Sequence, residues 1–181
     1  MLNRLVLLDS SVLINLLATR QAGDILRVLS SGAGIRRAVE AEALFLRGEN
    51  PSDVPERVCL APLIDAGVLE RFDLENDAEK AAYVDLAADL EDGEAMTLAI
   101  AHGRGLATAT DDRKARRIAA ERYGKSLALV RTTEILRAWV QVSSVDDATL
   151  RGVLNRIESI ARFRPANDDP LRDWWVAAGL R

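Results

Sequence analysis

The sequence predicts an α/β fold in which helices cover a parallel sheet. Short apolar segments alternate with longer segments of helical composition, and two of the apolar segments run directly into carboxylates. The 181 residues, 49% of them hydrophobic, are enough for one well-filled core and short for two. We therefore expect one domain built from repeated strand–helix units.

The first strand–helix unit sets the pattern for the rest of the chain. Residues 5–8 are uniformly apolar, as in a strand buried on both faces, and the run ends at Asp9. Ser10 and Ser11 offer hydroxyl groups that can cap a helix beginning near Val12. Because ligands bind at the carboxyl ends of strands in an open α/β sheet, Asp9 is a candidate site residue.

The next segment is expected to contain two helices separated by a turn and a brief extended piece. Residues 23–29 and 38–46 have helical compositions, and a turn rich in Gly and Ser lies between them at residues 30–34. Glu40 and Glu42 are two positions apart, so they point to nearly opposite sides of a helix. Glu42 has the more apolar neighbours and is the better candidate. The alternative is that it lies at the edge of an apolar stripe with its charge in water.

The middle of the chain is expected to be a loop followed by a short helix, a strand and a longer helix. Residues 48–62 contain three of the five prolines and form a candidate flap, with a short strand or turn around residues 58–60. A short helix is expected over residues 63–67, a strand over 68–72 and a helix over 78–90.

A second long helix is expected over residues 94–101. Asp92 is its candidate N-cap, and Glu94 lies in its first turn. Glu94 is thus a candidate site acid. The alternative is that its charge only stabilises the positive end of the helix dipole.

Carboxylates also follow a later predicted strand, over residues 106–110. This strand runs into Asp111 and Asp112, and residues 113–123 have a strongly helical composition, so the unit repeats the first one. The remaining elements expected are one short strand and two helices, over residues 127–130, 134–142 and 146–163.

The composition excludes several classes of protein. A single cysteine, Cys59, excludes an internal disulfide, and with a single histidine, His102, it supplies too few soft ligands for a structural zinc site. No apolar stretch approaches the roughly 20 residues that span a bilayer, and the start of the chain does not resemble a signal peptide. We therefore expect a cytoplasmic protein that does not enter a membrane. The formal charge of −4 argues against coating nucleic acid through bulk positive charge, but not against local contact.

The acids at the predicted strand and helix ends point to metal-dependent chemistry. The candidates are Asp9, Glu42, Glu94 and Asp112, with Asp111 and Asp92 as neighbours that could assist. Carboxylates gathered in one place repel one another unless cations are present, and Mg²⁺ or Mn²⁺ prefers such oxygen ligands. Bound ions of this kind activate water and polarise phosphoryl oxygens, which is the chemistry of a phosphodiester nuclease.

These acidic motifs resemble those of PIN-domain ribonucleases, notably the VapC-type toxins. The matching segments are LLDSSVLINLL around Asp9, AVEAEALFL around Glu42, EDGEAMTLAIAHG around Glu94 and ATATDDRKARRIA around Asp112. In the family's Thr-x-Asp pattern Asp112 is the match to Thr110, so it is preferred over Asp111.

The resemblance implies a three-layer α/β/α fold and Mg²⁺- or Mn²⁺-dependent cleavage of RNA, with Asp9, Glu42, Glu94 and Asp112 as catalytic and metal-binding residues and Asp111 as a further metal ligand. The resemblance covers roughly residues 1–130, and it also implies a homodimer. We therefore expect a nuclease domain over residues 1–133 and, beyond the resemblance, a helical extension over residues 134–181 packed on the same domain. A toxin would in addition need a separately encoded antitoxin that blocks the acidic pocket.

A run of basic residues follows the last acids. Its members are Arg113, Lys114, Arg116 and Arg117. They could hold RNA phosphates beside the metal, or they could form the solvated face of a helix. Arg36 and Arg37 leave the same two interpretations open.

Two other functions stay open at this point. One is a non-catalytic module with the same fold that binds nucleic acid or protein. The other is a phosphohydrolase with Asp9 as covalent nucleophile. That chemistry usually needs a second aspartate two residues later, where this chain has Ser11.

Overall fold

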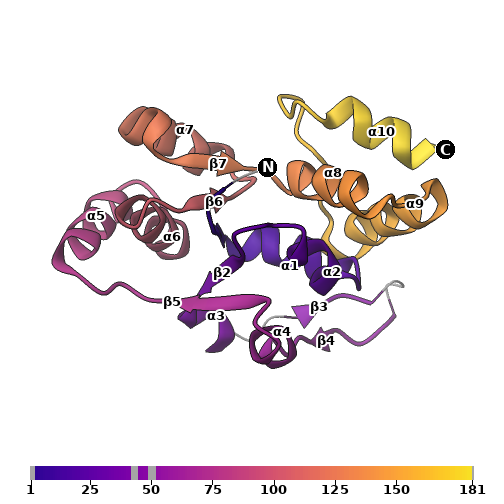
Figure 1. Cartoon of the computed structure of the whole chain (residues 1–181), viewed down its shortest axis with the longest axis horizontal. Helices are drawn as coiled ribbons and strands as arrows, with labels where there is room; N and C mark the ends of the chain where they lie inside the picture. Colours follow the sequence, from indigo (N-terminus) through magenta and orange to yellow (C-terminus); the bar gives the residue numbers. More distant parts are fainter. Residues whose placement is uncertain (1–2, 42–44, 49–51, 181) are drawn as a thin grey trace.

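A five-stranded parallel sheet lies at the centre of the molecule and confirms the α/β prediction. The computed structural model describes residues 3–41, 45–48 and 52–180. The strand order is β5-β2-β1-β6-β7, with β1 in the middle (Figure 1). All neighbouring strands of this sheet are parallel. The strands are β1 (Val6–Leu8), β2 (Ala33–Arg36), β5 (Leu69–Phe72), β6 (Ala107–Ala109) and β7 (Ala128–Val130).

Helices cover both faces of the sheet, which gives the three-layer α/β/α arrangement (Figure 1). One layer contains α5 (Asp77–Ala87), α6 (Asp92–Gly103) and α7 (Arg113–Tyr123). The opposite layer contains α1 (Ser10–Ala18), α2 (Ala22–Arg27), α8 (Thr132–Ser143) and α9 (Asp147–Arg156). The other elements are α3 (Arg37–Ala41), α4 (Ala61–Asp65), a 3₁₀ turn (Gly124–Ser126), a π-helical turn (Ile157–Ala161) and α10 (Arg172–Leu180).

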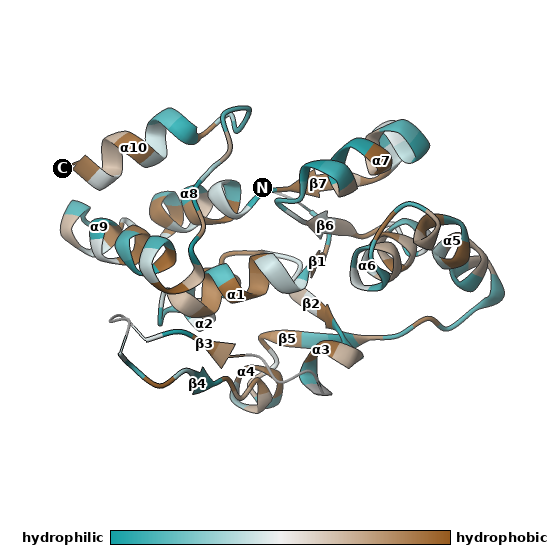
Figure 2. Cartoon of the chain, turned by 180° about the vertical axis from the view of Figure 1, so that it is seen from behind, coloured by the Kyte–Doolittle hydropathy of each residue, from teal (hydrophilic) through white to brown (hydrophobic). Residues whose placement is uncertain are grey.

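The central strand joins two hydrophobic cores because its side chains alternate between the faces of the sheet. Leu7 packs with residues of α5, α6 and α7, whereas Val6 and Leu8 pack with residues of α1, α8 and α9. All three side chains are fully buried. Hydrophobic colouring is accordingly concentrated toward the sheet, and α7 is largely hydrophilic on its outer side (Figure 2).

Several element boundaries differ from the sequence-based expectation. The helix expected to reach Leu46 is replaced at its end by a short strand, β3 (Phe45–Leu46), which pairs with β4 (Glu56–Arg57) in an antiparallel ladder apart from the main sheet. Phe45 is exposed and Leu46 is buried, which is the alternation of a strand. The short strand or turn expected around residues 58–60 is wrong, because the strand β4 ends at Arg57 and residues 58–60 form neither.

The C-terminal helices pack on the same core as α1. Ile135, Leu136, Val153 and Trp175 belong to the hydrophobic cluster that contains Val6 and Leu8. The helix expected over residues 146–163 ends earlier, because α9 passes into the π-helical turn and Arg162 adopts a left-handed conformation with φ of 56°. Within the described part of the chain, no helix is both long and apolar enough to cross a membrane.

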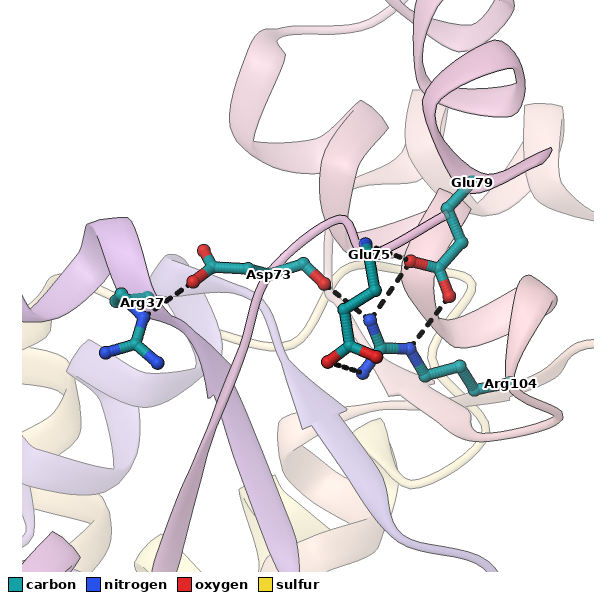
Figure 3. Close-up of polar contacts among 5 residues, drawn as sticks. All are labelled: Arg37, Asp73, Glu75, Glu79 and Arg104. Carbon is teal, nitrogen blue, oxygen red and sulfur yellow. Dashed lines mark hydrogen bonds and ion pairs between the residues drawn. The ribbon is translucent and has the colours of Figure 1, made fainter. Parts of the chain in front are cut away.

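A buried ion pair fixes the connection between β5 and α5 (Figure 3). Arg104, just after α6, donates to both carboxylate oxygens of Glu79, at 2.8 and 3.0 Å, and to the carbonyl oxygen of Asp73. Glu79 is only 1% exposed and also accepts from the backbone amide of Glu75 at 2.8 Å. Asp73 in turn pairs with Arg37 of α3. The network ties α3, α5 and α6 to one linker.

The Glu79 carboxylate should make the protein sensitive to acid. Hydrogen bonds from Arg104, and then from the Glu75 amide, lower the pKa of Glu79 from 4.5 to about 2. A lowered pKa contributes stability above pH 4.5 that is lost as the pH falls toward 2. Between pH 5 and pH 2.5 we expect the wild type to lose about 2 kcal/mol more unfolding free energy than Glu79→Gln.

Urea unfolding at the two pH values measures this difference. Glu75→Gln is the matched control, because Glu75 contacts the same arginine from an exposed position and should keep the pH dependence of the wild type. Equal slopes for the wild type and Glu79→Gln would contradict the prediction.

Candidate active site

Asp9 lies where the central strand β1 meets α1. Its backbone amide donates to the carbonyl oxygen of Ala109 at 2.9 Å, which fixes it beside the end of β6. Its side chain is the N-cap of α1: it accepts from the Ser11 amide at 3.4 Å and from the Ser11 hydroxyl at 2.6 Å. The expectation that Ser10 or Ser11 caps this helix is therefore wrong. The aspartate one position earlier reaches the free amide first.

Asp112 occupies the equivalent position at the start of α7. Its carboxylate accepts from the Ala115 amide at 2.7 Å, and its own amide donates to the hydroxyl of buried Thr110 at 3.2 Å. Hydrogen bonds thus fix both the backbone and the carboxylate of Asp112. Asp9 and Asp112 are the caps of helices that follow adjacent strands.

Glu94 comes from the first turn of α6. Residue Glu91 is the N-cap of this helix, so the expectation that Asp92 caps it is wrong. Asp92 is instead the first helical residue, and its carboxylate accepts from the Tyr83 hydroxyl at 3.2 Å. Glu94 is half-buried. Burial raises its pKa, and so do the charges of Asp112 and Asp9, which shows that the three carboxylates share one electrostatic environment.

These acids line one cleft of about 790 Å³. Its walls come from the starts of α1, α6, α7 and α8 and from the segment before α10. The lining residues are Asp9, Ser10, Ser11, Arg36, Glu91, Asp92, Gly93, Glu94, Asp111, Asp112, Arg113, Arg131, Phe163, Arg164, Ala166 and Asp169. Helix N-termini carry partial positive charge, which partly offsets the repulsion between the carboxylates.

Asp111 also lines the cleft, but its carboxylate accepts hydrogen bonds from other residues of the protein. It accepts from the Thr132 amide at 3.1 Å, from the Thr132 hydroxyl at 2.5 Å and from the Asn15 amide group at 3.3 Å. Burial raises the pKa of Asp111, whereas the Thr132 hydrogen bonds lower it. Asp111 therefore joins the end of β6 to α8 and α1.

Asp169 is a buried acid of the cleft that the sequence analysis missed. Its side chain is 6% exposed and accepts from the hydroxyl of Thr133, at 3.0 and 3.1 Å, and from the Leu171 amide at 2.8 Å. The neighbouring residues Thr132 and Thr133 thus each hold one acid. The polar stretch that contains Asp169 is visible in the sequence, but its contact with α8 is not.

Arg36 places a buried positive charge in the cleft. It is 6% exposed at the end of β2, and its Nη2 lies 3.4 Å from the Ser10 hydroxyl. A Cβ atom at Gly93 would lie 2.8 Å from this nitrogen, so the glycine leaves room for the guanidinium. Arg37 is exposed and pairs with Asp73. The two arginines that sequence alone left equivalent therefore lie in different places.

The basic residues after Asp112 have different surroundings. Arg113 lines the cleft, and Lys114 is exposed on α7. Arg116 donates to the carbonyl oxygens of Thr110 and Val130, at 2.9 and 3.0 Å, and so ties the ends of β6 and β7 together. Arg117 pairs with an acid one turn later on the same helix.

Glu42, the remaining predicted acid, lies outside the described residues. Among the residues that the structure does describe, no group of three acidic, histidine or cysteine side chains is arranged to hold a metal ion. Mg²⁺ is commonly held by one or two carboxylates and keeps several waters. The donor set of Asp9, Glu94 and Asp112 consists of hard oxygens with mutually repelling charges, so its chemistry fits Mg²⁺ or Mn²⁺.

Comparison with known proteins gives one match. A family model described as a PIN domain matches residues 5–167, which include the described cleft acids Asp9, Glu94, Asp111 and Asp112. No curated protein and no solved structure matches the chain.

Removing one charge from the cleft should stabilise the protein when divalent cations are absent. Asparagine retains an oxygen that can cap α1, so Asp9→Asn keeps the helix start and relieves repulsion with Glu94. We expect a gain of about 1 kcal/mol in unfolding free energy at pH 7.5 in EDTA. Denaturant unfolding measures the gain, with Asp173→Asn at an exposed position of α10 as the charge-matched control. A loss of stability in Asp9→Asn, or an equal gain in the control, would show that repulsion is not significant.

Proposed function

Because the chain belongs to the PIN-domain family, we propose that it is a metal-dependent endoribonuclease that hydrolyses RNA phosphodiester bonds. PIN domains are generally nucleases. The observation that carries the proposal is the convergence of Asp9, Glu94 and Asp112 on one cleft at the carboxyl edge of the sheet. Their electrostatic coupling favours a site that takes up cations.

In this proposal Mg²⁺ or Mn²⁺ is held by Asp9, Glu94 and Asp112, with Glu42 and Asp111 as further ligands. The bound ion supplies an activated water and polarises the phosphoryl oxygen. Hydrogen bonds hold these side chains in place: the Ser11 hydroxyl donates to the Asp9 carboxylate, and the Ala115 amide donates to the Asp112 carboxylate. Preorganised side chains of this kind reduce the cost of ordering the site when substrate binds.

Arg36 is proposed to contact the phosphate. A guanidinium group offers donors that match phosphate oxygens, and its burial beside Ser10 and Gly93 limits competition from water. Arg113, Lys114, Arg116 and Arg117 are proposed to contact other phosphates of the strand. Of these, Arg116 also has a structural role through its bonds to two strand ends.

The toxin role is part of the same proposal. A separately encoded antitoxin would block the acidic cleft, and the chain would act as a homodimer. The support for both partners is the resemblance of the acidic motifs to those of VapC-type toxins.

Loss of any one of the three proposed metal-binding acids should strongly reduce cleavage. We expect Asp9→Asn, Glu94→Gln and Asp112→Asn each to lower metal-dependent cleavage of RNA at least about 100-fold, because the ion loses a ligand and the water its activation. The assay uses fluorescent single-stranded and structured RNA with Mn²⁺, Mg²⁺ or EDTA. Asp92→Asn is the matched control, since Asp92 lines the same cleft but bonds to Tyr83.

Calorimetric titration with Mn²⁺ separates the alternatives. A wild type that neither cleaves RNA nor binds Mn²⁺ would favour a non-catalytic binding module. Cleavage that survives in EDTA would point instead to metal-independent chemistry and would overturn the proposal.

Variants of Arg36 and Arg37 test whether Arg36 contacts a phosphate of the RNA. We expect Arg36→Gln to lower kcat/KM for RNA about 10- to 100-fold, because a buried charge-assisted contact is lost, and Arg36→Lys to retain part of the rate. Arg37→Gln removes the same charge one residue later from an exposed position and should change kcat/KM less than about twofold. Thermal unfolding checks that each variant is folded, and equal effects at the two positions would contradict a specific role for Arg36.

A further inference from the structure

A basic groove adjoins the carboxylate cleft. It has a volume of about 630 Å³ and lies between α7 and the segment that joins β7 to α8. Its lining residues are Arg113, Lys114, Arg116, Arg117, Ala120, Leu129, Arg131 and Asp168. Arg113 and Arg131 line both the groove and the cleft, so the two cavities are neighbours at these residues. We refer to Arg113 and Arg131 together as the seam.

The seam lies next to the proposed catalytic acids. Arg113 directly follows Asp112 at the start of α7. Arg131 directly precedes α8, and the Glu134 carboxylate accepts from its backbone amide at 2.8 Å, which fixes its main chain. A strand that followed the groove would therefore reach Asp112 immediately after it passed the seam.

An acidic side chain occupies the space between the two seam arginines. The Asp168 carboxylate lies 3.5 Å from Arg131 Nη2 and 4.0 Å from Arg113 Nε, with one oxygen facing each. It is 52% exposed, and the pairs are long, so each contributes little to stability. The next residue, Asp169, is buried against Thr133 and holds this part of the chain on α8. Asp168 is thus positioned by its neighbour and not by its own ion pairs.

The geometry points to Asp168 as the occupant of a phosphate site: an RNA strand that runs from the basic groove into the cleft places one phosphate between Arg113 and Arg131, where it replaces the Asp168 carboxylate. This inference rests on the proposed nuclease function. A phosphodiester group carries the same single charge as the carboxylate and likewise has two terminal oxygens, and arginine binds such groups with two parallel hydrogen bonds. The Asp168 carboxylate is half exposed and both of its pairs are long, so displacing it costs little.

The consequence is that Asp168 competes with the substrate. Arg116 is bound to carbonyl oxygens at the ends of β6 and β7, and Arg117 is paired with Glu121 at the surface. Among the cations of the groove, the seam arginines and Lys114 are therefore best placed to contact an RNA strand. A carboxylate held between the two seam arginines weakens their attraction for phosphate. Removing its charge should strengthen RNA binding, even though a contact within the protein is lost.

Anisotropy of a fluorescein-labelled 15-nucleotide single-stranded RNA of mixed sequence tests the inference. The experiment uses the full chain with Asp9→Asn in EDTA, so that binding is measured without cleavage. On this background we expect Asp168→Asn to lower Kd about three- to tenfold, because the seam arginines become available to phosphate. Asp173→Asn makes the same charge change at an exposed position of α10 and should lower Kd less than about twofold.

A second background tests whether the arginines mediate the gain. With Arg113→Gln and Arg131→Gln in place, Asp168→Asn should no longer improve binding. A gain that persists in this background, a gain equal to that of Asp173→Asn, or weaker binding in Asp168→Asn would each overturn the inference. If RNA binds and only the Asp168 effect is missing, the proposed function stands without it. If the wild type neither binds nor cleaves RNA, the proposed function fails and the inference fails with it.

Discussion

The structure depends on carboxylates that begin helices at one edge of a parallel sheet. Asp9 and Asp112 each accept a hydrogen bond from the first turn of the helix that they cap, and Glu94 lies in the first turn of a third helix. These positions let like charges gather, because the amides and dipoles of the helix starts offset part of their repulsion. The same hydrogen bonds that start the helices also direct the carboxylates. Secondary structure and the site are therefore built by one set of contacts.

The C-terminal segment completes this arrangement from the opposite side of the cleft. Thr132 binds Asp111 at the end of β6, and Thr133 binds Asp169 in the segment before α10. Two successive residues of α8 thus join the sheet edge to the C-terminal part of the chain. The family match extends to residue 167, and the cleft wall made by Phe163, Arg164 and Ala166 falls within it.

Local patterns in the sequence are sufficient to predict the parallel sheet and the presence of acids at the ends of its strands. The apolar run before Asp9 and the strand before Asp112 were recognisable because a buried strand ends abruptly at a charge. The caps of α1 and α6 were misplaced by one or two residues, since several neighbouring side chains can accept from the same free amides. The roles of Arg36, Arg131 and Asp169 depend on residues distant in sequence, which no local pattern encodes. Glu42 lies outside the described residues and stays a prediction.

The close approach of Arg36 to Gly93 couples these two positions of the chain. A Cβ atom at position 93 would lie 2.8 Å from Nη2 at the end of the Arg36 side chain, so a larger residue there would require the guanidinium to shift. A shorter residue at position 36 would remove this contact, and a side chain at position 93 would then meet no guanidinium. The coupling is therefore one-sided: the placement of the arginine depends on the glycine, whereas this contact limits position 93 only while the arginine is present.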